Sequence, residues 1–498
     1  MSVAPDIIEH MFDKRIHDHW DPPETPASRA LLAGLVESSR QENRAAARRL
    51  AAVAELFEMR RAERGESEEW AVDTWAAVGA EVAAALRVSL GKAGSYLNYG
   101  LAMRRLPSVA AVFAAGEVDL TMFTTIVYRT ELITDSSIMV EVDSLIAARA
   151  ARWPSMTPGR LAREIDRVVH AVDPDAVRRA RERSRDRDVT IWHEGGDTAD
   201  VSGRLLAADA AALDRRLDAV AATACEQDPR SAGQRRADAL GALAAGADRL
   251  MCRCGSAQCP AAAATPSPIV IHVVAEQSTL AGRNDRPALL LGTGTLITAE
   301  QVRDLAAQAR VRPLIAPPVA EPRYRPSRTL ADFVRARDLT CRAPGCDRPA
   351  VACDLDHTVP YAEGGATHAS NMKCLCRLHH LIKTFWGWQD KQLVDGTVIW
   401  TLPGGQTYVT TPGSALLFPS LSAPTRDISL PSRRPPSRDG HRVADRAVMM
   451  PVRKTTRAAN RAHRIATERM HNRRARQSRA VAAGIAGTPP CAGGDPPF

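Results

Sequence analysis

The 498-residue chain is predicted to combine a mainly helical N-terminal domain containing a few short strands, a small zinc-stabilised domain and a basic C-terminal tail. Three observations support this fold class. Apolar residues recur at helical spacing over much of residues 28–312, cysteines and histidines gather between residues 341 and 380, and positive charge is concentrated near the C-terminus. Because the chain exceeds the size of one ordinary core, we expect two or three domains.

The composition is that of a globular protein, with 45% hydrophobic and 25% charged residues. No apolar run reaches the length of about 18 residues that a membrane helix needs, so we expect no membrane span. The first residues, MSVAPDIIEHMFDKR, carry acids where a signal peptide has a basic start and an apolar run, which predicts a cytoplasmic location. Ten cysteines, most of them in two tight clusters, favour metal binding over a disulfide framework.

The helical domain is expected over residues 28–312, after a flexible N-terminus at residues 1–27. A helical pattern runs from Leu31 to about Arg64, where Gly65 ends it. Thr157 is expected to cap a helix over residues 159–171, and Thr298 is expected to cap a helix over residues 297–309. The other expected helices cover residues 70–90, 101–115, 120–132, 140–152, 177–187, 207–224 and 234–250.

Short strands are expected at three places in the same domain. Residues 188–194 and 199–205 predict a hairpin, because two β-rich runs flank a Gly-Gly turn. The apolar, β-branched run at residues 268–274 predicts a third strand.

A proline-rich linker is expected at residues 313–326, because five prolines there cannot continue a helix. The zinc-stabilised domain then covers residues 327–419. It is expected to begin with a helix in ADFVRARD and to contain a hairpin formed by residues 393–401 and 406–411. Three tryptophans are expected in its core rather than as base-stacking platforms: Trp386, Trp388 and Trp400.

The tail, residues 420–498, is expected to be disordered or partly helical, with helical periodicity between about residues 455 and 482. Residues 431–480 hold 15 Lys and Arg residues against three acidic residues, while the net charge of the whole chain is +9. Such a tail predicts contact with nucleic acid, and a solvated tail is the alternative. The candidate phosphate ligands are Arg473, Arg474 and Arg476. The upstream stretch at residues 178–187 is balanced by acidic residues and predicts a solvated helix face.

Two pairs of zinc-compatible residues lie thirty positions apart. Cys341 and Cys346 flank a Pro-Gly turn, and Cys376 precedes His379 by three residues. Two such pairs are what a closed tetrahedral zinc site requires, and a small domain gains stability from the metal. Cys353 and Cys374 are spare thiols that can replace an assigned ligand. The alternative is that these cysteines are buried as small hydrophobic residues.

A second set of chemically competent residues overlaps the first: Asp356, His357, Asn371 and His380. Phosphodiester hydrolysis needs a base that activates water and a divalent cation that neutralises charge. Adjacent residues of a strand point to opposite faces, so one of Asp356 and His357 can bind metal while the other faces the nucleophile. His379 and His380 diverge by about 100° on a helix, so one can face the zinc and the other a catalytic metal.

The segment from Cys353 to Lys383 resembles the HNH (ββα-metal) endonuclease motif in DLDHTVP, the following Gly-Gly and NMKCLCRLHHLIK. The resemblance implies that His357 is the general base and that Asp356 and His380 bind Mg²⁺ or Mn²⁺. Asn371 takes the central Asn position, and Lys383 follows at the family's spacing. His379 replaces the second cysteine of the closing pair, so the structural zinc would have three thiolates and one imidazole.

The whole chain is similar to actinobacterial repeat-family proteins in which a helical domain of unknown function (DUF222-like) precedes an HNH domain. CRCGSAQCP, ADAAALDRRLDA and TPGSALLFP carry this similarity, which supplies no function for the helical part. Together the two resemblances imply hydrolysis of DNA that leaves 5′-phosphate and 3′-hydroxyl ends. The alternatives are a non-catalytic DNA-binding protein that retains the zinc fold and an RNA-binding zinc protein.

Three further cysteines, Cys252, Cys254 and Cys259, lie within eight positions in MCRCGSAQCP. They predict a second zinc site, with His272 as the candidate fourth ligand. A reduced surface loop is the alternative.

Overall fold

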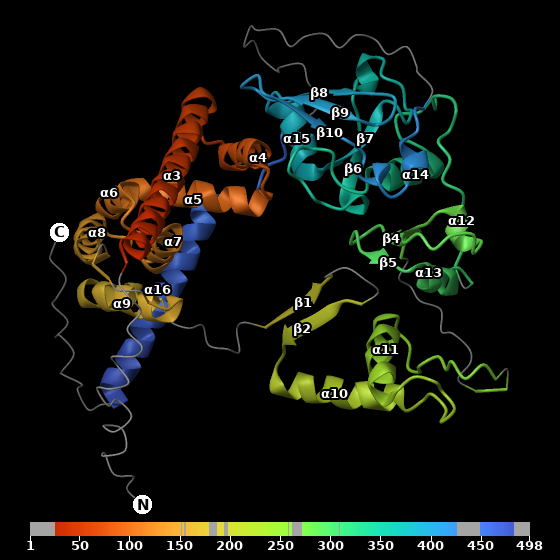
Figure 1. The fold of residues 1–498 in the computed structure, drawn as a ribbon, viewed down its shortest axis with the longest axis horizontal. Helices are drawn as coiled ribbons and strands as arrows, with labels where there is room; N and C mark the ends of the chain where they lie inside the picture. Colours follow the sequence, from red (N-terminus) through yellow and green to blue (C-terminus); the bar gives the residue numbers. More distant parts are fainter. Residues whose placement is uncertain are drawn as a thin grey trace, which may run out of the picture. The chain divides into compact units, whose positions relative to one another are not determined.

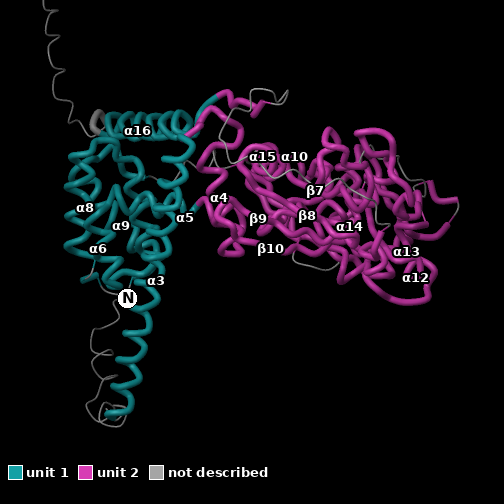
Figure 2. The backbone as a smooth tube through the Cα atoms, turned by 90° about the horizontal axis from the view of Figure 1, so that it is seen from above, with its two compact units in different colours: residues 1–65, 95–178, 455–498 teal, residues 66–94, 179–454 magenta. Residues whose placement is uncertain are grey.

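The computed structural model describes residues 25–150, 152–153, 156–178, 187–193, 198–256, 258–260, 271–307, 309–425 and 449–482. The chain divides into two compact units (Figure 2). Unit 1 comprises residues 1–65, 95–178 and 455–498, and unit 2 comprises residues 66–94 and 179–454. This division differs from the linear order of domains expected from the sequence, because each unit is assembled from segments that lie far apart in the chain.

Unit 1 is helical. Its long helix α3 (Pro26–Arg64) begins at a capping box between Thr25 and Ser28 and ends, as predicted, at Gly65, whose φ is 73°. Only the second half of α3 is buried, where Gly100 packs so closely that a Cβ there would lie 2.4 Å from the Leu50 carbonyl oxygen. The other described helices of the unit are most of α5 (Leu90–Arg105), α6 (Pro107–Ala115), α7 (Leu120–Arg129), α8 (Ser136–Ala150), α9 (Pro158–Val172), the short 3₁₀ helix η2 (Pro174–Ala176) and α16 (Arg457–Ala482).

One expected helix of this region is two helices in the structure. The sequence predicted a helix over residues 101–115, whereas α5 (Leu90–Arg105) ends before Leu106 and α6 begins at Pro107. Proline has no amide hydrogen and is suited to the first turn of a helix. The carboxylate of Asp143 accepts hydrogen bonds from the amides of Ser108 and Val109 at 2.7 and 2.9 Å, which stabilises the new N-terminus. The predicted cap at Thr157 is confirmed for α9.

The tail helix α16, drawn in blue in Figure 1, belongs to unit 1 (Figure 2). Arg469 pairs with Asp173 at 2.7 Å, and the side-chain amide of Asn472 donates to the carbonyl oxygens of Asp175 and Val177. The prediction of a partly helical tail is therefore confirmed over residues 457–482, and residues 426–448 and 483–498 lie outside the described part of the chain.

Between residues 187 and 307, unit 2 consists of small substructures. The predicted hairpin is confirmed as β1 (Asp188–Trp192) paired antiparallel with β2 (Asp200–Arg204), and α10 (Ala207–Ala221) and α11 (Ala232–Ala244) follow it. A three-stranded sheet has the order β3-β4-β5. Its elements are β3 (Val273–Val274), β4 (Ala288–Leu290) and β5 (Leu296–Ile297), with α12 (Gln277–Leu280) and α13 (Ala299–Ala306) beside them. Strand β3 covers two residues of the expected run 268–274, of which residues 268–270 are not described.

The remainder of unit 2 is built around one hydrophobic core. Its elements are α4 (Thr74–Leu86), α14 (Arg328–Asp338), β6 (Cys353–His357), β7 (Met372–Cys376), α15 (Arg377–Phe385) and a sheet of β8 (Gln389–Gln392), β9 (Val398–Thr401) and β10 (Thr407–Thr410). Four 3₁₀ helices also lie here: η3 (Ala350–Ala352), η4 (Tyr361–Glu363), η5 (Gly413–Ala415) and η6 (Pro419–Ser422). Trp386, Trp388 and Trp400 are buried in the core, as predicted.

Residues 66–94 complete this core, although they lie within the expected helical domain. The indole nitrogen of Trp386 donates to the Val72 carbonyl oxygen at 3.2 Å, and Trp70 packs edge-on against Trp386. Arg453 pairs with Asp73 at 2.9 Å, which adds residues from near the start of the tail. Among the described helices, none is both long and apolar enough to cross a membrane.

Candidate functional site

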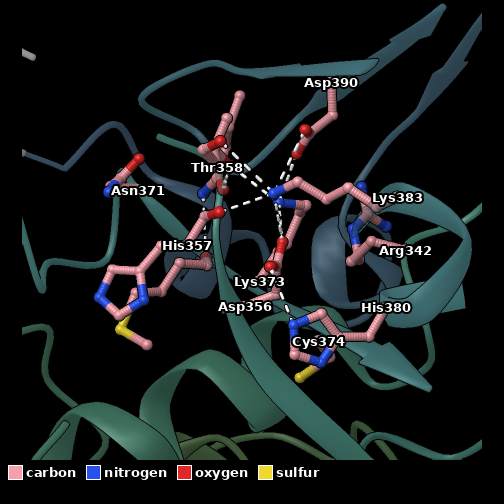
Figure 3. Close-up of polar contacts among 12 residues, drawn as sticks. Arg342, Asp356, His357, Thr358, Asn371, Lys373, Cys374, His380, Lys383 and Asp390 are labelled. Atoms are coloured by element: carbon pink, nitrogen blue, oxygen red, sulfur yellow. Dashed lines mark hydrogen bonds and ion pairs between the residues drawn. The ribbon is translucent and has the colours of Figure 1, made fainter. Parts of the chain in front are cut away.

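The predicted site lies on a strand–strand–helix substructure formed by β6, β7 and α15. The two strands are antiparallel, with Asp356 opposite Lys373 and His357 opposite Met372, and α15 begins directly after β7. Because neighbouring residues of a strand point to opposite faces, Asp356 and His357 diverge, as expected (Figure 3).

Asp356 belongs to a buried cluster of four charged side chains. Its Oδ2 accepts hydrogen bonds from Lys373 and Lys383, each at 2.6 Å. Asp390, from β8, lies 2.5 Å from the Nζ of Lys373 and 3.3 Å from that of Lys383. Two carboxylates therefore balance two ammonium groups, which is how buried charge is tolerated.

The electrostatics of this cluster keep Lys373 charged. Burial alone would lower the pKa of Lys373, but the carboxylates of Asp356 and Asp390 outweigh burial and raise it. The pKa of Lys383 is lowered by its burial and by the neighbouring charge of Lys373. The sequence analysis assigned no role to Lys373 or Asp390. A lysine within the otherwise apolar strand MKCLC was the available signal, because a buried lysine requires a carboxylate partner.

His380, on α15, lies between two carboxylates. Its Nδ1 is 2.9 Å from Oδ2 of Asp354, and its Nε2 is 3.5 Å from Oδ1 of Asp356. A carboxylate only accepts hydrogen bonds, so the contact with Asp354 requires a proton on Nδ1 and turns Nε2 toward Asp356. Asp356 Oδ1 and His380 Nε2 are thus two candidate metal ligands. Two protein ligands suit Mg²⁺, which keeps several waters.

His357 lies on the other face of β6 and is buried. Its Nε2 is 2.9 Å from the hydroxyl of Thr367, and its ring stacks against Tyr324 with a centroid distance of 5.4 Å. Burial lowers the pKa of His357 below its ordinary value of 6.5, which favours the neutral imidazole. The Thr367 hydroxyl donates to the Tyr324 carbonyl oxygen at 3.4 Å, so its oxygen can accept a hydrogen bond from Nε2–H; in that tautomer Nδ1 is left to accept a proton.

Asn371 ties together the loop between β6 and β7. Its side-chain amide donates to the carbonyl oxygens of Val359 and Ala366 at 3.0 and 2.9 Å, and its Oδ1 accepts from the Val359 amide at 2.9 Å. Lys383 also holds this region, because its Nζ donates to the carbonyl oxygen of His357 at 2.6 Å. Both residues therefore contact the chain that carries His357.

Helix α14 supports β7 through two buried residues that the sequence analysis did not single out. The carboxylate of Asp338 accepts from the Cys374 amide at 2.8 Å and from Arg337 Nε at 2.8 Å. The guanidinium of Arg337 also donates to the carbonyl oxygens of Ala369 and Met372, each at 2.7 Å. These contacts fix the position at which β7 begins.

The four predicted zinc ligands meet in one place. The ligand atoms of Cys341, Cys346, Cys376 and His379 all lie within 4.8 Å of one another and could hold a metal ion such as zinc. His379 Nδ1 is 3.3 Å from Sγ of Cys376 and 3.6 Å from Sγ of Cys341. Tetrahedral zinc with bonds of about 2.0–2.3 Å separates its ligands by about 3.5–3.8 Å, so the residues fit. The two spare thiols, Cys353 and Cys374, are not in this group.

The cysteines of MCRCGSAQCP also form a group, but the expected fourth member is wrong. Cys252, Cys254 and Cys259 meet Cys225, whereas His272 is exposed and lies outside the group. Cys225 follows α10, 27 residues before Cys252. No local spacing marks an isolated cysteine at a helix end as a ligand, so only the packing of α10 against α11 could identify it.

The arginines proposed for nucleic-acid binding are partly engaged within unit 1. Arg473 and Arg476 contact the Asp175 carboxylate at 3.1 and 2.9 Å. Burial would raise the pKa of Asp175, but hydrogen bonds from both arginines outweigh it and lower the pKa. Arg474 is exposed. Two of the three arginines therefore hold the tail helix in place.

The expected linker contributes to the site. The Glu321 amide donates to the Thr367 carbonyl oxygen at 2.9 Å, and the Tyr361 hydroxyl donates to the Pro322 carbonyl oxygen at 3.0 Å. This segment places Tyr324 on His357, with exposed Arg323 and Arg325 on either side of it in the chain. The sequence analysis missed this role because prolines dominated the pattern.

The fold and the site thus define a mainly helical protein with a few short strands, whose described residues include two cysteine-containing groups that could hold metal. Residues 37–338, more than half of the chain, match the family described as Domain of unknown function (DUF222), and the chain belongs to that family. The matched region ends three residues before Cys341.

Several curated relatives span nearly the whole chain. The uncharacterized protein Rv2100 of Mycobacterium tuberculosis (strain ATCC 25618 / H37Rv) is 43% identical over 520 residues, covering 95% of this chain and 92% of the relative. The uncharacterized protein Rv3776 of the same strain is 44% identical over 473 residues, covering 89% and 90%. No solved structure matches the chain.

Proposed function

We propose that this protein is a metal-dependent HNH-type endonuclease that hydrolyses DNA phosphodiester bonds, with His357 as the general base. The observation that carries the proposal is the orientation of His380. Asp354 holds its Nδ1 at 2.9 Å while its Nε2 faces Oδ1 of Asp356 at 3.5 Å. A histidine whose second nitrogen is bound by a carboxylate is the usual arrangement of a metal-binding imidazole.

The protein groups would divide the work between the two faces of β6. His357 accepts a proton from water at Nδ1, while Thr367 and Tyr324 hold its ring. Asp356 and His380 bind Mg²⁺ or Mn²⁺. Lys383 donates hydrogen bonds to the Asp356 carboxylate and to the His357 carbonyl oxygen, and so holds these two residues in position relative to each other. A bound divalent ion supplies positive charge to the phosphate and the leaving oxygen. The group formed by Cys341, Cys346, Cys376 and His379 holds a structural zinc.

DNA is the proposed substrate because positive charge lies next to the proposed base. Arg323 and Arg325 are exposed on the segment that covers His357. Arginine binds phosphate oxygens through charge-assisted hydrogen bonds, and such contacts position a nucleic acid without reading its sequence. Replacing both arginines with alanine should weaken DNA binding and reduce its salt dependence. The control is to replace Arg310 and Arg312, which precede the segment paired with Thr367; this change should leave DNA binding and its salt dependence unaltered.

A second candidate is a DNA-binding module that does not hydrolyse its ligand. One contact favours it: Oδ2 of Asp356 is already bound by Lys373 and Lys383, so a single carboxylate oxygen remains for metal. The two candidates make different predictions for cleavage and the same prediction for binding.

The deciding experiment is a plasmid cleavage assay with Mg²⁺, Mn²⁺ or EDTA. We expect wild type to nick or linearise plasmid only with metal, and both His357→Ala and His380→Ala to lose cleavage while still binding DNA. His368→Asn is the matched control, because His368 is a buried histidine of the same loop that contacts Ser370 instead. Thermal melting checks that each variant is folded. Binding by folded wild type without cleavage would select the second candidate.

A further inference from the structure

The helical hairpin of α10 and α11 ends in a cluster of cysteines that the proposed nuclease chemistry does not use. We propose that Cys225, Cys252, Cys254 and Cys259 form a second, structural zinc site, with Cys225 as its fourth ligand. This site lies outside the HNH-like substructure, so the proposal does not depend on the proposed function.

The geometry of the thiols suits zinc. All four sulfur atoms lie within 4.8 Å of one another, and those of Cys225 and Cys252 are 3.4 Å apart. Zinc–sulfur bonds of about 2.3 Å place the corners of a tetrahedron about 3.8 Å apart. Cys252 is buried and the other three are partly buried. Four protein ligands close the coordination shell and leave no position for substrate, which identifies a structural site.

A polar frame brings the two cysteine-bearing segments together. The carboxylate of Asp228, which is fully buried, accepts from Arg230 Nε and Nη2 at 2.9 and 2.7 Å. It also accepts from the Arg253 amide at 2.9 Å, and Arg230 Nη2 donates to the Met251 carbonyl oxygen at 2.7 Å. Two residues before each of Cys225 and Cys252, the Leu250 amide donates to the Thr223 hydroxyl at 2.8 Å. The frame therefore flanks both Cys225 and Cys252 and positions them without metal.

The hairpin has a structural need for such a site. Its own core contains three buried hydrophobic residues, Val220, Ala239 and Leu250, and most of α10 is exposed. A core of this size buries little apolar surface, and small substructures of this kind are commonly held by metal. Zinc bound to residues after both helices would fasten the open end of the hairpin.

Two rival interpretations are less consistent with the structure. A site completed by His272 is disfavoured because that exposed histidine is outside the group. A disulfide between Cys225 and Cys252 would require a sulfur separation of about 2.05 Å rather than 3.4 Å. It would also leave unexplained why Cys254 and Cys259 converge on the same point.

Zinc content of the purified full-length chain tests the proposal. We expect two zinc ions per chain in wild type, one in Cys225→Ser and two in the control His272→Ala, measured by mass spectrometry of the metal. Cys376→Ser should also hold one ion, and the double variant Cys225→Ser/Cys376→Ser none. If Cys225→Ser retains the zinc content of wild type, or if His272→Ala loses one ion, the proposal is overturned.

A second measurement keeps the proposal testable if Cys225→Ser does not fold. The Cys376→Ser chain, reloaded with Co²⁺, should show the absorption spectrum of a four-thiolate cobalt site. The wild-type chain, treated in the same way, should show that spectrum together with the spectrum of a three-thiolate, one-imidazole site. A Cys376→Ser spectrum without thiolate-to-cobalt absorption, or a Cys225–Cys252 disulfide in peptide mapping of the freshly isolated chain, would overturn it. Because Cys376 and Cys225 are varied separately, loss of the HNH-site zinc is distinguishable from loss of the hairpin zinc.

Discussion

Replacing Asp354 with alanine should weaken divalent-metal binding without removing a metal ligand. Asp354 lies two residues before Asp356 on β6, so both side chains are on the same face of the strand. Its Oδ2 accepts the Nδ1 hydrogen of His380 at 2.9 Å and is 3.4 Å from Arg377. Without this carboxylate the imidazole can rotate away from the metal position, so Nε2 binds metal less tightly.

The solvent exposure of Asp354 and His380 determines how large a loss of metal affinity we expect. Loss of a carboxylate that orients a metal-binding histidine typically lowers metal affinity by about 10–100-fold. The Asp354 side chain is 42% exposed and that of His380 is 26% exposed, so water screens the contact and can replace it in part. We therefore expect the low end of the range, about tenfold, which corresponds to roughly 1.4 kcal/mol.

The assay is plasmid cleavage over a Mn²⁺ titration, together with direct Mn²⁺ binding by electron paramagnetic resonance. Asp354→Ala should raise the Mn²⁺ concentration at half-maximal rate about tenfold and restore most of the rate at saturation. Asp332→Ala is the matched control, because that carboxylate is 35% exposed and pairs with Arg328 at 3.6 Å on α14. An unchanged Mn²⁺ dependence in a folded Asp354→Ala protein would refute the assigned role of His380.

Three other predictions concern stability. Asn371→Ala should lower the free energy of unfolding of unit 2 by about 2–4 kcal/mol, because three hydrogen bonds to buried backbone groups are lost; a denaturant titration measures it. Gly365→Ala should also destabilise unit 2, since a Cβ there would lie 1.8 Å from the Val359 carbonyl oxygen. In contrast, a Cβ at Gly241 in α11 would meet no atom within 4 Å, so Gly241→Ala should stabilise that helix by about 0.5–1 kcal/mol in the same titration. The pKa of Asp175 is lower when folded, so its ion pairs stabilise the docked α16 above about pH 4 and are lost as the pH falls through the folded pKa. Melting curves of wild type and Asp175→Asn should therefore differ at pH 6 and converge at low pH, and a constant difference would contradict this.

Local signals were sufficient for much of the secondary structure. The cap at Thr157, the stop at Gly65 and the β1–β2 hairpin depend on side chains and turns within a few residues of each other, and all three are confirmed. The break at Pro107 and the short strands β4 and β5 were missed, whereas β3 lies within the predicted run 268–274. A strand that short has too few alternating positions to produce a recognisable period, so its pairing partner defines it.

The sequence by itself determined which residues carry chemistry: paired Cys and His spacing selected one metal group, and strand alternation separated Asp356 from His357. Only the tertiary structure decided which distant groups complete each site. Cys225 joins the second cysteine group, Asp390 balances Lys373, and residues 66–94 complete the core of unit 2. The physical reason is that ligand spacing and alternation are local properties of the chain. Charge compensation and burial depend on segments that meet only when the chain folds.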